Sequence, residues 1–256
     1  MGRRPLPRLV LAYHGVAKVR VREDPNLLFV PPDDVVRHIR RLRRWGYELL
    51  PFSGFADRLR TGRAAGCAAL TFDDGFVESL EALAPMLAAE QAPATVFVPS
   101  GWLGRAHPNA PQTRVMTADE VRTLRSHGVE IGAHTHSHPD LTTLDHDAAL
   151  DELRRGKAGL EELLGEPVDT LAYPFGRADA ATREATRAAG FVAACRTGGE
   201  GNWSDPLDIP RQDMTNAATM LGLRLKRDER YEPLVKVLPF RAARAARRRF
   251  LRATGR

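Results

Sequence analysis

The sequence predicts an α/β fold built on a parallel sheet, and three observations lead to this prediction. Short apolar runs alternate with helical patterns about seven times along the 256 residues. The runs are unbroken rather than alternating between polar and apolar residues, which is typical of parallel strands covered by helices on both faces. A hydrophobic fraction of 43% excludes general disorder. A barrel and an open doubly wound sheet both fit this alternation, and a single domain of about 220 residues suits the barrel.

Seven apolar runs are the predicted strands. They cover residues 9–14, 47–50, 67–72, 94–99, 129–133, 169–174 and 191–196. In parallel α/β folds the functional groups gather at the carboxyl ends of the strands. The residues that follow these runs are therefore the candidates for chemistry.

The predicted helices lie between the strands and carry start and stop signals. They cover residues 32–46, 117–128, 145–165 and 179–190. The first begins with Pro32, which suits a first helical turn, and stops at Gly46. Thr117 and Glu120 have the spacing of a capping box. Each of the four patterns ends at a glycine, the residue that most readily caps a helix at its carboxyl end.

The formal net charge of +6 is unevenly distributed. Residues 224–256 contain twelve Lys or Arg and three Asp or Glu, a net charge of +9, so residues 1–223 carry −3. We therefore predict one barrel domain over residues 1–223 and a basic helical tail over residues 224–256. The tail could be a solvated helix packed by its apolar residues, or it could bind an anionic membrane surface. No nucleic-acid partner is expected, because no aromatic platform or reading motif accompanies the arginines.

Targeting and redox signals favour the cytoplasm. The apolar run that ends at Tyr13 is shorter than the core of a signal peptide, and no run approaches the ~20 residues of a membrane helix. Cys67 and Cys195, the only cysteines, each lie in a predicted strand and are expected to be reduced core thiols. The expected location is cytoplasmic, with peripheral association at the inner membrane face if the tail binds lipid.

Carboxylates and imidazoles follow two of the predicted strands. Asp73 and Asp74 come directly after the third strand, and a cluster of three histidines follows the fifth. His134 and His138 are four residues apart, which places both rings on one face of a helical turn, whereas His136 points elsewhere. Taken separately, the aspartates could form a turn and the histidines a solvated loop. Together they favour a metal site, because two histidines and one carboxylate are a common ligand set for catalytic Zn²⁺.

Residues 71–75 (TFDDG), followed about sixty residues later by residues 134–138 (HTHSH), resemble the polysaccharide deacetylases, carbohydrate esterase family four. Residues 11–16 (LAYHGV) and 171–176 (LAYPFG) also match the style of this family. The resemblance covers roughly residues 8–214. It implies a single-domain, distorted (β/α) barrel, often with seven strands, that uses a divalent metal to hydrolyse N- or O-acetyl groups on sugars.

The resemblance also implies roles for individual residues. Asp73 matches the catalytic base of the family. The implied metal ligands are Asp74, His134 and His138. The implied residues of the substrate groove are Tyr173 and Phe175. A backbone N–H near Tyr173 is expected to stabilise the oxyanion together with the metal.

Two features common in the family are missing, and two residues are candidates to replace them. No histidine follows His146 to act as the late general acid; His14 is the candidate, and the alternative is a histidine hydrogen-bonded in the barrel mouth. The arginine that usually precedes the third motif is absent too. Arg211 could replace it as a partner of Asp73 or of the substrate, and the alternative is a surface salt bridge. A subset of the family with an N-terminal Tyr-His strand shares these features, and its better-known members act on poly-N-acetylglucosamine.

The sequence therefore predicts a metal-dependent sugar N-deacetylase. The expected ion is Zn²⁺, with Co²⁺ and Ni²⁺ as alternatives. The expected substrate is an N-acetylated sugar, either an oligosaccharide or a nucleotide-linked or lipid-linked sugar. Two other functions remain open: a non-catalytic, metal-containing carbohydrate-binding descendant of the same fold, and a hydrolase of another acyl or amide bond.

Overall fold

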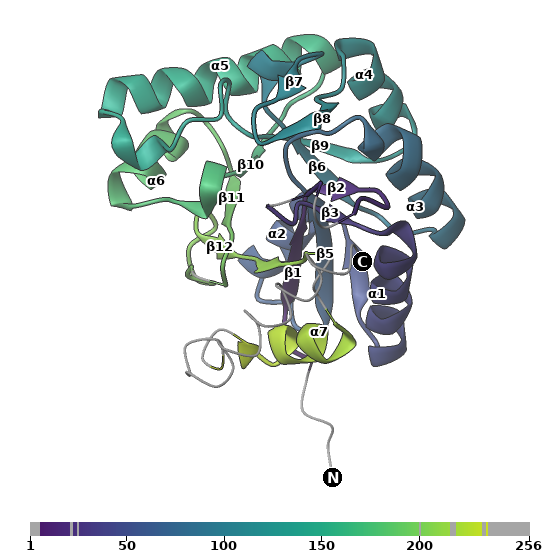
Figure 1. The fold of residues 1–256 in the computed structure, drawn as a ribbon. Helices are drawn as coiled ribbons and strands as arrows, with labels where there is room; N and C mark the ends of the chain where they lie inside the picture. Colours follow the sequence, from purple (N-terminus) through teal and green to yellow (C-terminus); the bar gives the residue numbers. More distant parts are fainter. Residues whose placement is uncertain are drawn as a thin grey trace.

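A ring of parallel strands surrounded by helices forms the centre of the molecule (Figure 1). The computed structural model describes residues 6–20, 23–24, 26–199, 201–215, 219–231 and 234. The strands of the central sheet are β1 (Leu9–Tyr13), β4 (Glu48–Leu50), β5 (Cys67–Phe72), β6 (Thr95–Val98), β9 (Glu130–Ala133), β10 (Thr170–Ala172), β11 (Ala193–Arg196), β12 (Ile209–Pro210) and β13 (Gln212–Asp213). The fold is the predicted distorted α/β barrel, and all seven predicted strands are present.

One segment that was not among the seven predicted strands closes the ring. β12 pairs with β11, and β13 pairs with β1, so residues 209–213 bridge the two edges of the sheet. Only Arg211 separates these two short strands, and its backbone N–H still donates to the Arg196 carbonyl at 3.0 Å. Each of these strands is only two residues long, and β12 includes Pro210, so they give little periodic signal. This explains why the segment was not counted among the seven strands.

The helices are α1 (Pro32–Trp45), α2 (Phe52–Arg60), α3 (Ala84–Glu90), α4 (Ala118–Ser126), α5 (His146–Leu164), α6 (Ala180–Ala188) and α7 (Met220–Arg227). The four predicted helices correspond to α1, α4, α5 and α6. Gly46 caps α1 in the left-handed conformation, and the capping box of Thr117 and Glu120 is formed at the start of α4. The short helices α2 and α3 were not predicted. None of the described helices has the length and apolar character needed to cross a bilayer.

Two further pairs of short strands lie outside the central sheet. β2 (Gly15–Val16) pairs with β3 (Phe29–Val30), and β7 (Ala106–His107) forms a hairpin with β8 (Ala110–Arg114). In Figure 1 the hairpin lies at the top of the view, whereas α7 lies at the bottom. α7 spans the predicted domain boundary between residues 223 and 224, and most of the predicted tail lies outside the described residues.

Side-chain alternation separates two cores. Along β1, Leu9, Leu11 and Tyr13 belong to the large cluster that packs against the helices, whereas Val10 belongs to a smaller cluster. The smaller cluster combines residues of α2 with residues of six strands that point into the ring: Val10, Cys67, Ala69, Phe97, Ala172, Ala193, Cys195 and Ile209. Both cysteines are free and buried there, as predicted. Strand side chains alternate between faces. Residues just beyond the carboxyl end of a strand therefore point to the barrel interior when they keep the same alternation.

Candidate active site

A pocket of about 400 Å³ lies at the carboxyl ends of the barrel strands. Six of the eight predicted site residues line it: His14, Asp73, Asp74, His134, His138 and Phe175. The other two, Tyr173 and Arg211, are completely buried behind the pocket. Residues from opposite ends of the sequence thus meet at one mouth of the barrel.

Three of these residues form a compact group of potential metal ligands. Asp74 Oδ1 lies 3.5 Å from His134 Nε2 and 3.4 Å from His138 Nε2, and the two Nε2 atoms are 3.2 Å apart. His134 Nδ1 donates to the Ala172 carbonyl at 2.7 Å. This bond places the ring proton on Nδ1 and leaves a lone pair on Nε2, the arrangement found in metal-binding histidines.

The spacing of the three ligand atoms fits a tetrahedral ion. Metal–ligand bonds of about 2.0–2.1 Å place two corners of a tetrahedron about 3.3–3.4 Å apart. The three observed separations, 3.2, 3.4 and 3.5 Å, lie around this value. Burial acts to raise the pKa of Asp74, but the neighbouring imidazoles of His107, His134 and His138 hold it well below its usual value. The carboxylate is therefore charged, and this donor set fits a divalent cation.

Unusual backbone conformations shape the loops around these side chains. Among the described residues, seven non-glycine residues have a positive φ. Five of them lie at the pocket or in the histidine loop: Leu27, Asp74, Thr135, His138 and Phe175. Such conformations cost about 1–3 kcal/mol each and occur where the surrounding structure holds functional groups in place. In the histidine loop, the Thr135 hydroxyl accepts the His138 N–H at 3.0 Å and stabilises the turn that brings the second imidazole back to the first.

Asp73 is not part of the ligand group and forms a buried ion pair. Arg211 donates from Nη1 to Asp73 Oδ1 and from Nη2 to Oδ2, both at 2.7 Å. The same guanidinium also donates to Thr71 Oγ1 at 2.9 Å and to the Arg196 carbonyl at 3.2 Å. Burial acts to raise the pKa of Asp73, but the charges of Arg211 and His134 hold it below its usual range. Asp73 is therefore a fixed, ionised carboxylate facing the pocket.

Two predicted substrate-binding residues must be corrected. Arg211 is 0% exposed, engaged with Asp73 and not among the residues that line the pocket, so its side chain does not reach the pocket surface. Of the alternatives, it is the partner of Asp73, and it forms no surface salt bridge. Tyr173 is also 0% exposed, and its hydroxyl donates to the Leu207 carbonyl at 2.9 Å. Its own backbone N–H donates to the Cys195 carbonyl at 3.0 Å. The oxyanion donor expected near Tyr173 would therefore be another N–H of this turn, and it stays a prediction.

Phe175 is the exposed residue of the same turn. Its side chain is 55% exposed, and its ring meets the His138 ring edge-on at 4.9 Å between centroids. The turn depends on Gly176, which has a φ of 67° and where a Cβ atom would lie 2.1 Å from Thr197 Oγ1. Phe175 is therefore the residue of this motif that can face a bound ligand.

The pocket also contains residues that the sequence did not single out. His107, on the β7–β8 hairpin, is 2% exposed, and its Nε2 lies 3.4 Å from Asp74 Oδ2. Asp213, at the end of the closing segment, lines the pocket with one buried carboxylate oxygen that has no hydrogen-bond partner among the described residues. Neither lies in a short motif, so only the fold could bring them to the site.

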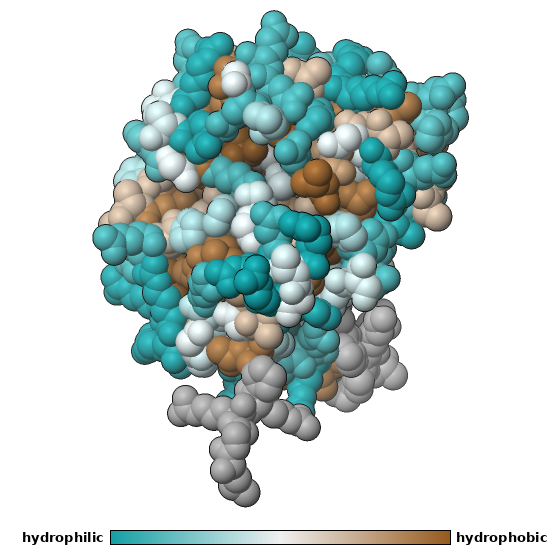
Figure 2. Space-filling model, turned by 180° about the vertical axis from the view of Figure 1, so that it is seen from behind, coloured by the Kyte–Doolittle hydropathy of each residue, from teal (hydrophilic) through white to brown (hydrophobic). Residues whose placement is uncertain are grey.

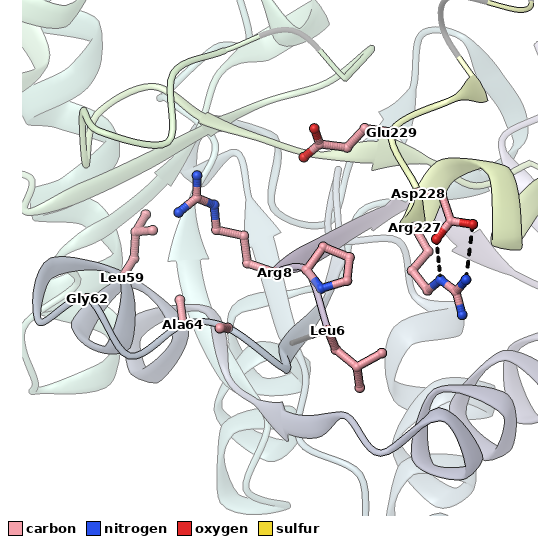
Figure 3. A pocket seen from close by; sticks show the side chains of 10 residues that line it. Leu6, Arg8, Leu59, Gly62, Ala64, Arg227, Asp228 and Glu229 are labelled. Carbon is pink, nitrogen blue, oxygen red and sulfur yellow. Dashed lines mark hydrogen bonds and ion pairs between the residues drawn. The ribbon is translucent and has the colours of Figure 1, made fainter. Parts of the chain in front are cut away.

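A second pocket, of about 420 Å³, lies at the opposite end of the barrel, next to the start of β1 (Figure 3). Its wall is formed by Leu6, Leu59 and Ala64, together with charged side chains that include Arg8 and residues after α7. It contains no histidine or cysteine. Within the described part of the chain, the group of Asp74 and its two histidines is the only potential metal-binding cluster. This cluster lies in the pocket at the carboxyl ends of the strands, which is therefore the candidate active site.

Comparisons with known proteins agree with this geometry. Residues 61–194, just over half of the chain, match the family model described as polysaccharide deacetylase. The YxkH protein of Bacillus subtilis (strain 168), whose name assigns it to the polysaccharide deacetylases, is 24% identical over 196 residues, which are 76% of this chain and 66% of the relative. A chitin deacetylase of Colletotrichum lindemuthianum is 28% identical over 116 residues, 45% of this chain and 44% of the relative.

A solved structure has the same fold over most of its length. The deacetylase PplD of Streptococcus pyogenes, solved in complex with acetate, aligns with a TM-score of 0.76 and 22% identity, covering 88% of this chain and 99% of that chain. The matched family region contains Asp73, Asp74 and the histidine loop, whereas His14 and Arg211 lie outside it.

Proposed function

The chain belongs to the polysaccharide deacetylase family, and from this premise we propose that it is a metal-dependent hydrolase that removes acetyl groups from N-acetylated sugars. The observation that carries the proposal is that the two adjacent aspartates have different partners. Asp74 faces two imidazoles at distances that suit a shared ion, and Asp73 is paired with a buried arginine. One carboxylate is thus assigned to the ion and the other to proton transfer.

Asp74, His134 and His138 would hold the divalent ion. When bound, such an ion lowers the pKa of a water molecule and polarises the acetyl carbonyl. Zn²⁺ is the ion we propose, and Co²⁺ and Ni²⁺ suit the same ligands.

Asp73 is the proposed general base. The hydrolysis adds water across the acetamide C–N bond, so a proton must leave the attacking water and another must reach the leaving nitrogen. The Arg211 pair keeps Asp73 ionised and fixes both carboxylate oxygens, which leaves their remaining lone pairs to accept the proton of the water. The pKa of Asp73 lies below its usual range, so the carboxylate is ionised at neutral pH and able to accept a proton.

His14 is the proposed general acid. It follows β1 on the interior face of the barrel and lines the same pocket as Asp73. An imidazole is a suitable donor because its ordinary pKa, about 6.5, lies near the working pH. His14 would give its proton to the departing amine while Phe175, exposed at the same pocket, contacts the sugar.

Acetate release tests the proposal. The purified chain is supplied with Zn²⁺ or Co²⁺ and offered N-acetylglucosamine oligomers, a nucleotide-linked N-acetyl sugar and a lipid-linked N-acetyl sugar. We expect acetate from at least one class, and none after chelation. His134→Ala should lose both metal and activity, whereas His136→Ala should keep both, because His136 bonds to Ser100 Oγ and lies outside the ligand group.

The same assay separates the remaining alternatives. Metal and sugar binding without acetate release would indicate the non-catalytic carbohydrate-binding function. Release of another acyl group in preference to acetate would indicate a different hydrolase. Acetate release that persists in the chelated protein would contradict the role of the metal.

A further inference from the structure

The β7–β8 hairpin inserts a buried histidine beside the carboxylate of the metal-ligand group. His107 is 2% exposed, and its Nε2 has no hydrogen-bond partner of good geometry among the described residues. The polar atom that faces this nitrogen is Asp74 Oδ2, at 3.4 Å. A buried imidazole next to a ligand carboxylate could be a fourth ligand, or it could be a donor that orients the carboxylate.

The protonation of the His107 ring decides between these two roles. The backbone N–H of Asn109 donates to His107 Nδ1 at 3.2 Å. Nδ1 is therefore an acceptor, and the proton of the neutral ring must lie on Nε2. The nitrogen that faces Asp74 carries a hydrogen atom and has no lone pair for a metal ion.

The two oxygens of Asp74 are divided between different partners. Oδ1 is the atom near His134 Nε2 and His138 Nε2, at 3.5 and 3.4 Å. Oδ2 faces His107 instead. A carboxylate that is free on both oxygens can bind an ion through both, which raises the coordination number and occupies room needed by water.

We propose that His107 is a positioning residue: it donates its Nε2–H to Asp74 Oδ2 and thereby restricts Asp74 to binding the ion through Oδ1 alone. This inference rests on the proposed metal-dependent function. Partners of this kind typically change metal affinity by 10–100-fold when removed.

Aromatic contacts hold the imidazole in this orientation. The His107 ring meets Phe76 edge-on at 4.7 Å and Trp102 edge-on at 5.3 Å between centroids. Trp102 in turn stacks on the ligand His138 at 5.0 Å. One tryptophan therefore contacts both the positioning histidine and a metal ligand, and the hairpin and the histidine loop form one packed unit.

The test measures metal binding directly, without reference to catalysis. His107→Leu removes the donor and nearly keeps the volume, whereas His107→Gln keeps an N–H donor at about the position of Nε2. His38→Leu is the matched control, because His38 is an equally buried histidine that bonds to Tyr13, on the helix-facing side of β1. Zn²⁺ affinity is measured by competition with a chromophoric chelator, and the Co²⁺ forms are compared by visible absorption.

We expect Zn²⁺ to bind His107→Leu about 10–100-fold more weakly. Its Co²⁺ spectrum should lose intensity as Asp74 engages both oxygens and the coordination number rises. His107→Gln should restore the affinity and the spectrum, and His38→Leu should match the wild-type chain in both. Unchanged Zn²⁺ affinity and Co²⁺ spectrum in His107→Leu would overturn the proposal. A folded His107→Gln variant that did not restore the affinity and the spectrum would overturn it too.

A measurement on the unaltered protein covers the case in which His107→Leu does not fold. ¹⁵N chemical shifts of the imidazoles report which ring nitrogen carries the proton. We expect His107 to be protonated on Nε2 both without metal and with Zn²⁺ bound. Loss of the Nε2 proton on Zn²⁺ binding would make His107 a ligand and overturn the proposal. A wild-type chain that binds no Zn²⁺ would refute the metal-dependent function instead, so the two failures are distinguishable.

Discussion

Two adjacent aspartates have different partners because the backbone turns between them. Asp73 still follows the extended path of β5, and its N–H donates to the Tyr13 carbonyl at 2.9 Å, as in a strand ladder. Asp74 adopts a φ of 68°, which rotates its carboxylate toward the histidines. A Cβ-bearing residue adopts this conformation only at a cost, so the separation of roles is part of the local structure and not a result of spacing alone.

Replacing Asp73 tests this division at the level of one side chain. Asp73→Asn should reduce turnover by at least about 10²-fold, because the amide cannot accept the proton, yet metal content should stay near wild type. Because Arg211 is left buried without its countercharge, the free energy of unfolding should fall by about 3 kcal/mol. Acetate release, metal analysis and urea unfolding measure the three quantities.

The control for this variant is an exposed ion pair. Asp151→Asn disrupts the pair of Asp151 with Arg155, whose side chains are more than half exposed, and should cost less than about 1 kcal/mol. If Asp73→Asn lost as much metal as His134→Ala, the assignment of base and ligand within the aspartate pair would be wrong.

His14 is tested through the leaving group. His14→Gln should reduce amide hydrolysis by about 10²-fold or more, with metal content unchanged. An acetate ester of nitrophenol should be affected far less, because its leaving group departs without protonation. His127→Gln, at an exposed position after α4, should change neither rate. Equal losses on both substrates would assign His14 to positioning or binding rather than to proton donation.

The residues predicted from short motifs were mostly brought together by the fold. For Arg211, whose role depends on distant packing, the sequence left several roles open, and only the structure identifies it as the partner of Asp73. Asp73, Asp74, His134 and His138 lie in compact patterns at strand ends, where alternation and loop spacing restrict their directions. Tyr173 lies in such a motif too, but its side chain turns into the core. No pattern near Arg211 indicates that residues 209–213 close the barrel.

At the level of elements, the β7–β8 hairpin and the closing segment provide what the sequence could not show. The hairpin carries His107, yet its two strands contain alanines, a proline and polar residues that do not resemble a strand pattern. The closing segment places Arg211 inside the ring because β12 and β13 pair with opposite edges of the sheet. Both contributions depend on tertiary pairing, which overrides weak local preferences.

The contact between α1 and β1 makes the stability of the barrel depend on pH. His38 Nδ1 of α1 and the Tyr13 hydroxyl form a buried hydrogen bond of 3.0 Å. Burial, with a smaller effect of Arg37, lowers the pKa of His38 from 6.5 to about 4. Between these values the unfolded chain binds more protons than the folded chain, so the free energy of unfolding should fall as the pH is lowered from about 6.5 to about 4. The shift corresponds to about 3 kcal/mol.

The variant His38→Asn should remove this dependence. The amide oxygen can accept the Tyr13 hydroxyl but does not titrate, so the difference in free energy of unfolding between wild type and variant should shrink steadily as the pH falls through this interval. Urea unfolding of the metal-free chains provides the measurement, and comparing two chains cancels the other titrating groups. A difference that stays constant with pH would show that His38 titrates normally in the folded protein.

At the level of the whole molecule, the two pockets lie at opposite ends of the barrel. The active-site pocket opens at the carboxyl ends of the strands, whereas Leu6 and the residues after α7 line the pocket at the other end (Figure 3). Seen from behind, the surface shows apolar residues in separate small patches among hydrophilic ones (Figure 2). On that face, association with a membrane would therefore require charge rather than a continuous apolar surface.

The basic segment after α7 is the proposed source of that charge, and it lies outside the described residues. Residues 235–256 contain eight Lys or Arg and no Asp or Glu. Each such residue contributes about 1 kcal/mol near an anionic membrane surface, and the apolar residues among them could enter the interface. Binding of this kind would bring the enzyme to a sugar carried on a lipid at the inner membrane face.

Co-sedimentation with anionic and neutral vesicles tests this proposal, and the structure shows where to shorten the chain. Lys226 is 5% exposed and lies 4.0 Å from the Tyr231 ring centroid, and Arg227 lies 4.5 Å from the ring centroid of Trp45. A truncation inside α7 would therefore damage the barrel, whereas a truncation after Leu234 spares these contacts.

We expect the full chain to bind anionic vesicles only, with an affinity that falls as the salt concentration rises. The truncated chain should stay in solution and should still release acetate from soluble oligomers. A second variant, in which Arg241, Arg244, Arg247, Arg248 and Arg249 are replaced by Gln at full length, should behave like the truncation, because charge rather than chain length is responsible. Vesicle binding that survives either change, or that does not depend on salt, would contradict the membrane proposal. The segment would then be interpreted as a solvated helix packed on the protein.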